Sequence, residues 1–161
     1  MIQRLDIKKE DFKMYELLKE FNEKLKLNII DIDINELNLQ NKKLRNKELE
    51  LLNNLNFKEL KVLNLTNNEI SNIKILENAN FKELKVLDLS SNKISDINVL
   101  EKANFKELKV LYLTNNEISD IQVLENANFK ELKELDLSYN NIDYNSTIIK
   151  HLKSKIENFY S

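Results

Sequence analysis

The sequence predicts an α/β solenoid, a stack of similar coils that each add one short strand to a parallel sheet and one short helix to the opposite side. The run Phe-Lys-Glu-Leu-Lys recurs every 24 residues, with copies that start at Phe57, Phe81, Phe105 and Phe129. Within a copy, apolar residues and asparagine keep fixed offsets, which in the first regular copy are Leu60, Leu63, Leu65, Asn68 and Ile70. Self-similarity at this period is typical of stacked repeats.

Composition limits the classes of function. The 161 residues, 42% of them hydrophobic, are enough for one folded unit with a real core. The 25 basic and 27 acidic residues are spread evenly, so there is no positive field for a phosphate backbone, and nucleic acid is disfavoured as a partner. Cysteine is absent, which excludes disulfides and thiolate chemistry and favours a reducing, cytoplasmic location.

The N-terminal segment, residues 1–33, does not fit the repeat and is predicted to be a cap. Its first residues carry frequent charges and no apolar run, so we expect neither a signal peptide nor a membrane span. Within residues 1–27, apolar residues recur at helical spacing and predict an amphipathic helix. They are Met14, Leu17, Leu18, Phe21 and Leu25. Alternation then predicts a short strand that contains Ile30, Ile32 and Ile34.

Five repeats are predicted over residues 34–142. The first is degenerate, because Lys42 stands where the later copies have asparagine. The regular copies at 57–80 and 105–128 differ only at Asn64/Tyr112, Asn72/Asp120, Lys74/Gln122 and Ile75/Val123. Residues 143–161 are predicted to form a C-terminal helical cap with an apolar face of Ile148, Leu152, Ile156 and Phe159.

Each coil assigns its residues to the core, the corners or the surface. Side chains alternate along a strand, so Leu63 and Leu65 are expected inside, and the repeated phenylalanines are expected to be buried with them. The chain has no glycine and no proline, so asparagine must make the corners, since it tolerates left-handed backbone and bonds nearby amides. A structural ladder is predicted from Asn68, Asn92, Asn116 and Asn140. Repeated serines, Ser71, Ser95 and Ser119, are interpreted as helix caps.

The outward side chains of the predicted sheet form the candidate binding surface. Three adjacent valines make an apolar stripe with acidic residues at either end, and tyrosines lie towards the C-terminal side. The candidate residues are Val62, Asn64, Thr66, Val86, Asp88, Ser90, Val110, Tyr112, Thr114, Glu134, Asp136 and Tyr139. An alternative interpretation is that valine has a high strand propensity and was copied with the repeat.

No constellation for catalysis or metal binding is evident. The single histidine, His151, is interpreted as a solvated residue of the C-terminal helix. A phosphate-binding loop rich in glycine is excluded by composition. Asp88 and Asp136 are two coils apart, about 10 Å, which is too far to share one cation. We therefore predict a non-catalytic protein with no cofactor and no metal.

The pattern of leucine, asparagine and isoleucine over residues 34–142 resembles the leucine-rich repeat family. The segment Asn-x-Ile-Ser-Asp-Ile-x-x-Leu is similar to the short repeats of phosphatase-regulating and internalin-like proteins. The resemblance implies a curved solenoid with its parallel sheet on the concave face and short helices on the convex face. It also implies that a protein is bound by the concave face.

Two functions follow as hypotheses. The first is a monomeric interaction module that binds a protein or peptide on the concave face. We expect it to bind neither a membrane nor nucleic acid. The second is a structural protein that self-associates, for example as a homodimer, through the concave face or a free sheet edge. A designed or truncated scaffold without a natural partner also fits the sequence.

Overall fold

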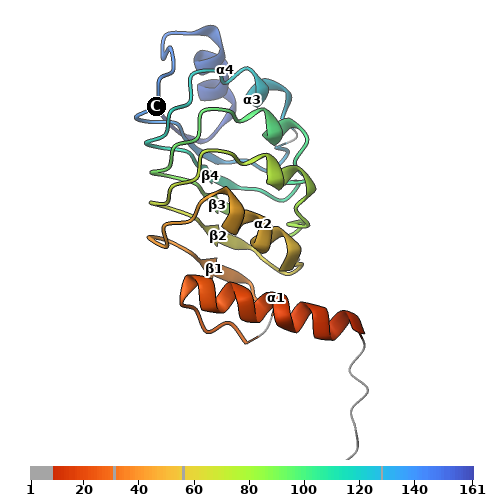
Figure 1. Ribbon diagram of the computed structural model, residues 1–161. Coiled ribbons are helices and arrows are strands. Elements are labelled where there is room, and N and C mark those ends of the chain that lie inside the picture. Colours follow the sequence, from red (N-terminus) through yellow and green to blue (C-terminus); the bar gives the residue numbers. More distant parts are fainter. Residues whose placement is uncertain (1–8, 31, 56, 128) are drawn as a thin grey trace, which may run out of the picture.

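The computed structural model describes residues 9–30, 32–55, 57–127 and 129–161, which form one parallel sheet flanked by helical segments (Figure 1). Helix α1 (Lys9–Leu25) comes first and lies across the end of the stack beside β1. The strands follow the order of the chain and are β1 (Glu36–Asn38), β2 (Val62–Asn64), β3 (Val86–Asp88), β4 (Val110–Tyr112), β5 (Glu134–Asp136) and β6 (Asn158–Tyr160). The predicted α/β solenoid is confirmed.

One residue of each three-residue strand points into the core, because side chains alternate along a strand. In the register of the sheet these inward residues are Leu37, Leu63, Leu87, Leu111, Leu135 and Phe159. The first five are buried and Phe159 is partly buried. The 24-residue period therefore places equivalent side chains side by side on neighbouring strands.

Helical segments line the side opposite the sheet (Figure 1). They are α2 (Asn46–Leu55), the 3₁₀ segments η1 (Lys74–Asn78) and η2 (Asn98–Glu101), and the short helix α3 (Val123–Asn126). Neighbouring segments contact one another in this order, and α1 also contacts α2. Helix α4 (Thr147–Lys155) follows the last coil and contacts β6.

The repeated phenylalanines lie in the core between the two sides. Phe57, Phe81 and Phe105 are at most 2% exposed, whereas Phe129 in the last coil is only partly buried. Small residues approach the core beside them, since Ala79 is 5% exposed. The burial predicted for the aromatic residues holds fully for three of the four coils.

Each coil turns at a residue with left-handed backbone that directly precedes the ladder position. The φ angles at these corners lie between 53° and 60°, and the residues are Asn41, Asn67, Ser91, Asn115 and Tyr139. Asparagine tolerates this conformation better than most residues do, so it takes the place that glycine often has in turns. Asparagine forms three of these five corners, at Asn41, Asn67 and Asn115, as the sequence predicted.

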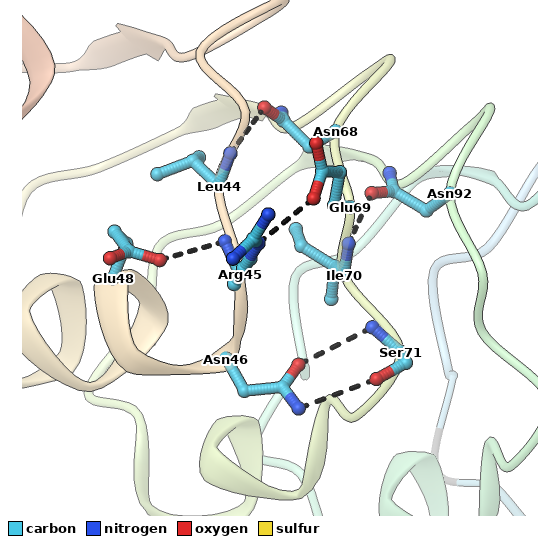
Figure 2. A network of polar contacts seen from close by, with 9 residues as sticks. All are labelled: Leu44, Arg45, Asn46, Glu48, Asn68, Glu69, Ile70, Ser71 and Asn92. Atoms are coloured by element: carbon cyan, nitrogen blue, oxygen red, sulfur yellow. Dashed lines mark hydrogen bonds and ion pairs between the residues drawn. The ribbon is translucent and has the colours of Figure 1, made fainter.

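In the later coils, the asparagine after each corner bonds the backbone of its own coil and of the preceding coil. Asn92 donates to the carbonyl oxygens of Leu65 and Leu89, both at 3.0 Å, and accepts from the amide of Ile70 at 3.1 Å. Asn68 likewise accepts from the amide of Leu44 at 3.0 Å (Figure 2). These bonds join successive coils and pair backbone groups that the corner would leave without partners.

The first coil shows how a repeat is held when its own ladder asparagine is missing. Lys42 occupies that position, and its amide donates to the side chain of Asn68 at 3.0 Å. Beside it, Arg45 donates to Glu69 at 2.8 Å, and Asn46 accepts from the amide of Ser71 (Figure 2). Asn46 also accepts from the amide of Asn72 at 3.1 Å. Side chains at the corner and on the helical side thus tie the degenerate coil to the first regular one.

The predicted strand around Ile30, Ile32 and Ile34 is wrong. The described residues of this segment form no strand, and Ile30 is 89% exposed. The amide and carbonyl of Ile29 both bond the side chain of Asn22, at 2.9 and 2.7 Å. A side chain of α1, rather than a neighbouring strand, therefore satisfies the backbone where the chain enters the sheet.

The C-terminal segment is helical over a shorter range than predicted. Helix α4 ends at Lys155, and the backbone of Ile156 is extended. Phe159 is not on the helix, because Asn158–Tyr160 forms β6, which pairs in parallel with β5. The segment therefore adds a sixth strand to the sheet as well as a helix.

The interpretation of the repeated serines as helix caps is also wrong. No side chain caps η1, η2 or α3. The turn before each segment is made by the next residue, since Asn72, Asp96 and Asp120 accept from the amide two positions ahead at 2.8 to 2.9 Å. The hydroxyl of Ser146, in contrast, does cap α4 by accepting from the amide of Ile149.

Candidate functional site

The candidate site is the surface formed by side chains of the sheet that point away from the core, which we call the outer sheet face. It comprises the twelve positions selected from the sequence, from Val62 to Tyr139. The structure aligns two rows of these positions in register across β2 to β5, with Val62, Val86, Val110 and Glu134 in the first row and Asn64, Asp88, Tyr112 and Asp136 in the second. Thr66, Ser90 and Thr114 follow their strands as a third row, and Tyr139 lies at a corner beside it. Most are partly buried, but Ser90 is buried and Tyr139 is 83% exposed. Sequence periodicity alone thus brought together residues that lie up to three strands apart.

The apolar centre of this face is a row of valines on adjacent strands. Val62 pairs with Val86, and Val86 pairs with Val110. All three are partly buried, and they lie on the side of the sheet opposite the helical segments (Figure 1). Glu36 and Glu134 lie next to the row at its two ends, so the apolar strip is bounded by acidic side chains.

A tyrosine and a glutamate form the closest side-chain contact on this face. The hydroxyl of Tyr112 donates to Oε1 of Glu134 at 2.7 Å. This hydrogen bond is the main reason that the pKa of Tyr112 is raised to about 12, with partial burial and the charges of Glu134 and Asp88 adding to it. The contact keeps Tyr112 protonated and holds its ring in place over the sheet.

Polar side chains of the second and third rows form hydrogen bonds with the backbone of the sheet. The hydroxyl of Thr114 donates to the carbonyl of Ser138 at 3.0 Å, while Asn64, Asp88 and Asp136 each accept from the backbone amide two residues ahead. These polar side chains therefore have local bonds within the scaffold.

The sequence analysis missed the part of this face that β6 contributes. Asn158 pairs with Glu134, and Tyr160 pairs with Asp136, so Tyr160 extends the row of Asp88, Tyr112 and Asp136. Tyr160 is 49% exposed. The alternation Asn158-Phe159-Tyr160 was the signal that could have identified this strand, but it spans only three residues.

Other parts of the described chain have fewer features of a binding site. A shallow hollow of about 400 Å³ between η1 and η2 is lined mainly by polar and charged side chains such as Lys74, Glu77 and Lys102. Among the described residues no group of His, Cys, Asp or Glu could hold a metal ion, and His151 is exposed. No helix within the described ranges is long and apolar enough to cross a membrane.

Comparison with known proteins identifies the repeat. A family model described as leucine-rich repeats in two copies matches residues 58–102 and 104–154, which is more than half of the chain. Leucine-rich repeat proteins are in general non-enzymatic binding modules. A comparison with curated proteins gave no match.

Solved structures with a similar fold include two internalins of Listeria monocytogenes. An internalin, inlF, has 32% sequence identity and a TM-score of 0.64 over 80% of this chain and 35% of its own. Internalin C2, inlC2, has 23% identity and a TM-score of 0.54 over 89% of this chain and 72% of its own, and this likeness concerns the fold alone. The chain thus spans about a third of the length of inlF.

Proposed function

Because this chain belongs to the leucine-rich repeat family, we propose that it is a non-catalytic interaction module that binds a protein or peptide through its outer sheet face. The observation that carries the proposal is the valine row beside Tyr112. Val62, Val86 and Val110 place a continuous apolar strip on the face opposite the helical segments, and a hydrogen bond to Glu134 fixes Tyr112 next to it. Aromatic residues within an apolar strip are typical of interaction hot spots.

Variation between near-identical coils supports the same face. The coils at 57–80 and 105–128 differ at four positions. On the outer sheet face the two coils differ only at one position, which is Asn64 in the first and Tyr112 in the second. Asn64 accepts a hydrogen bond from the amide of Thr66, and Tyr112 has no side-chain amide oxygen to make the equivalent bond. The tyrosine therefore replaces a residue with a structural task, which favours a role in binding.

The size of the face limits how it is used. Six strands at about 4.8 Å and four positions at about 3.3 Å give roughly 350 Å², against about 800 Å² per partner for a standard interface. A partner bound only to the strands would be held weakly. We therefore expect the partner to contact the corners as well, where the exposed Tyr139 lies.

Affinity capture from the source cell tests the proposal when two arginine substitutions are compared. Val86→Arg places a charge in the centre of the valine row, whereas Asn98→Arg places the same charge on the exposed helical side. Circular dichroism must show that both variants are folded. We expect proteins that wild type and Asn98→Arg retain and Val86→Arg loses. Equal capture by all three would contradict binding through the outer sheet face.

Self-association is the second candidate, and the free edge of β6 favours it. β6 is the last strand in the sheet order and pairs only with β5 among the described strands. An unpaired edge can accept a strand from a second copy. Light scattering over a range of concentrations tests this candidate, and a constant monomer mass would reject it.

A further inference from the structure

One row of the outer sheet face changes its charge along the solenoid. The register places Asn38, Asn64, Asp88, Tyr112, Asp136 and Tyr160 side by side from β1 to β6. The first two positions are neutral amides and the later ones are carboxylates and tyrosines. In the adjacent row Glu134 follows the three valines, so the C-terminal half of the face is both acidic and aromatic.

The fold does not require the negative charges in this row. Asn38 and Asn64 accept from the amide two residues ahead at 3.0 and 2.9 Å. Asp88 and Asp136 make the same bond at 2.9 and 2.8 Å. Since asparagine performs the structural task equally well in the same sheet, the charge at these two positions is free for another use.

The described part of the chain does not neutralise these carboxylates with ion pairs. Its ion pairs lie elsewhere, between Lys24 and Glu48, Arg45 and Glu69, and Lys102 and Glu77. Glu134 accepts from the neutral hydroxyl of Tyr112, not from a cation. Asp88, Glu134 and Asp136 thus present net negative charge on a partly buried surface, where charges are screened less than in bulk water.

Tyrosines between and beside the carboxylates define which cation would fit best. Tyr112 lies between Asp88 and Asp136 in the row, and Tyr160 lies on the other side of Asp136. A guanidinium stacks on an aromatic ring while it donates to carboxylates, which a compact ammonium does less well. A phosphate group, in contrast, would be repelled by this surface.

We propose that the C-terminal half of the outer sheet face, formed by Asp88, Tyr112, Glu134, Asp136 and Tyr160, receives arginine side chains of a basic peptide segment in the partner protein. The inference rests on the proposed function and specifies the partner's chemistry. The valine row then contacts apolar residues of the same segment. Charge complementarity gives the segment its orientation, with its basic part towards β5 and β6.

Two double substitutions isolate the charge at these positions. Asp88→Asn with Asp136→Asn keeps the turn bonds, as Asn38 and Asn64 show. Asp96→Asn with Asp120→Asn makes the same change on the helical side, where Asn72 already makes the equivalent bond. Each double substitution by itself raises the formal net charge of the protein from -2 to 0. They differ only in where the charge is removed.

The experiment is selection from a displayed library of random linear peptides, followed by affinity measurement with synthetic copies of the enriched peptides. We expect enrichment of arginine-containing peptides whose affinity falls roughly tenfold or more in the Asp88→Asn, Asp136→Asn variant, a loss typical of a removed charge pair. The helical-side pair should bind as wild type does. Added salt should weaken binding to wild type more than to the variant.

The remaining outcomes separate the two proposals. This inference is overturned if the enriched peptides lack basic residues, or if basic peptides bind both double variants equally. The proposed function still stands if Val86→Arg abolishes the binding of those peptides. Peptides that bind Val86→Arg as tightly as wild type contradict the outer sheet face itself. If no peptide is enriched, both the inference and the proposed peptide binding are rejected.

Discussion

Tyr139 is the bulkiest of the five corner residues with left-handed backbone. Its φ of 56° is left-handed, and the equivalent corners are made by Asn41, Asn67, Ser91 and Asn115. A bulky residue is disfavoured in this conformation, whereas asparagine tolerates it. Its side chain is 83% exposed, so burial in the chain itself offsets little of this cost.

We predict that Tyr139→Asn stabilises the protein by about 0.5 to 1 kcal/mol, because it restores the residue type that suits the corner. The urea midpoint at constant slope measures this change. If Tyr139 is part of the binding face, the same substitution weakens binding of the partner or selected peptide. A lower midpoint would show that Tyr139 makes a stabilising contact with its own chain.

The raised pKa of Tyr112 predicts a stability change in alkali. A folded-state pKa of about 12, above the ordinary value of 10.0, means that folding favours the protonated hydroxyl. This contribution is complete below about pH 10 and is lost as the pH rises towards 12. The advantage of wild type over Tyr112→Phe in the free energy of unfolding should therefore shrink across this window.

Glu134→Gln is the matched control for that measurement. It keeps an oxygen that can accept the hydrogen bond but removes the charge, so the window should still begin near pH 10 but should end at a lower pH than in wild type. A wild-type advantage over Tyr112→Phe that does not change between pH 9 and pH 12 would contradict the assigned contact between Tyr112 and Glu134.

Equivalent elements do not contribute equally along the stack. Phe105 in an inner coil is 2% exposed, whereas Phe129 in the last coil is partly buried. We predict that Phe105→Ala costs about 3 to 5 kcal/mol and that Phe129→Ala costs clearly less, since a partly solvated site loses fewer contacts. Urea unfolding of both variants measures the difference. Equal losses would mean that the last coil is as well packed as the inner ones.

The sequence was sufficient to predict the elements that repeat. The spacing of the leucines placed the strands, and their positions in the core were correct from Leu63 to Leu135. The outer rows followed from the same period. These features are local and occur several times in the chain, so each copy supports the interpretation of the others.

The two ends were not predictable in the same way, because tertiary contacts decide them. Ile30, Ile32 and Ile34 alternate as a strand would, yet Asn22 binds the backbone of Ile29. Phe159 fits a helical stripe, yet pairing with Leu135 makes it part of a strand. Segments this short carry too weak a periodic signal to compete with such contacts.

At the scale of the whole molecule, one face has a structural task and the other is available for a partner. The inward residues form the apolar core, and the ladder asparagines bond successive coils to one another. The outer sheet face combines an apolar row with an acidic and aromatic end. A solenoid presents such rows in a fixed register, since each coil contacts mainly its neighbours. We therefore expect the partner to bind this face.

Binding to this face is tested by nuclear magnetic resonance of methyl-labelled protein titrated with the tightest selected peptide or a captured partner fragment. The valine and leucine signals can be assigned by single substitutions. We predict that the methyl groups of Val62, Val86 and Val110 shift on binding, while those of Val99 and Val123 on the helical side do not. Shifts confined to the helical side, with the valine row unchanged, would contradict the account.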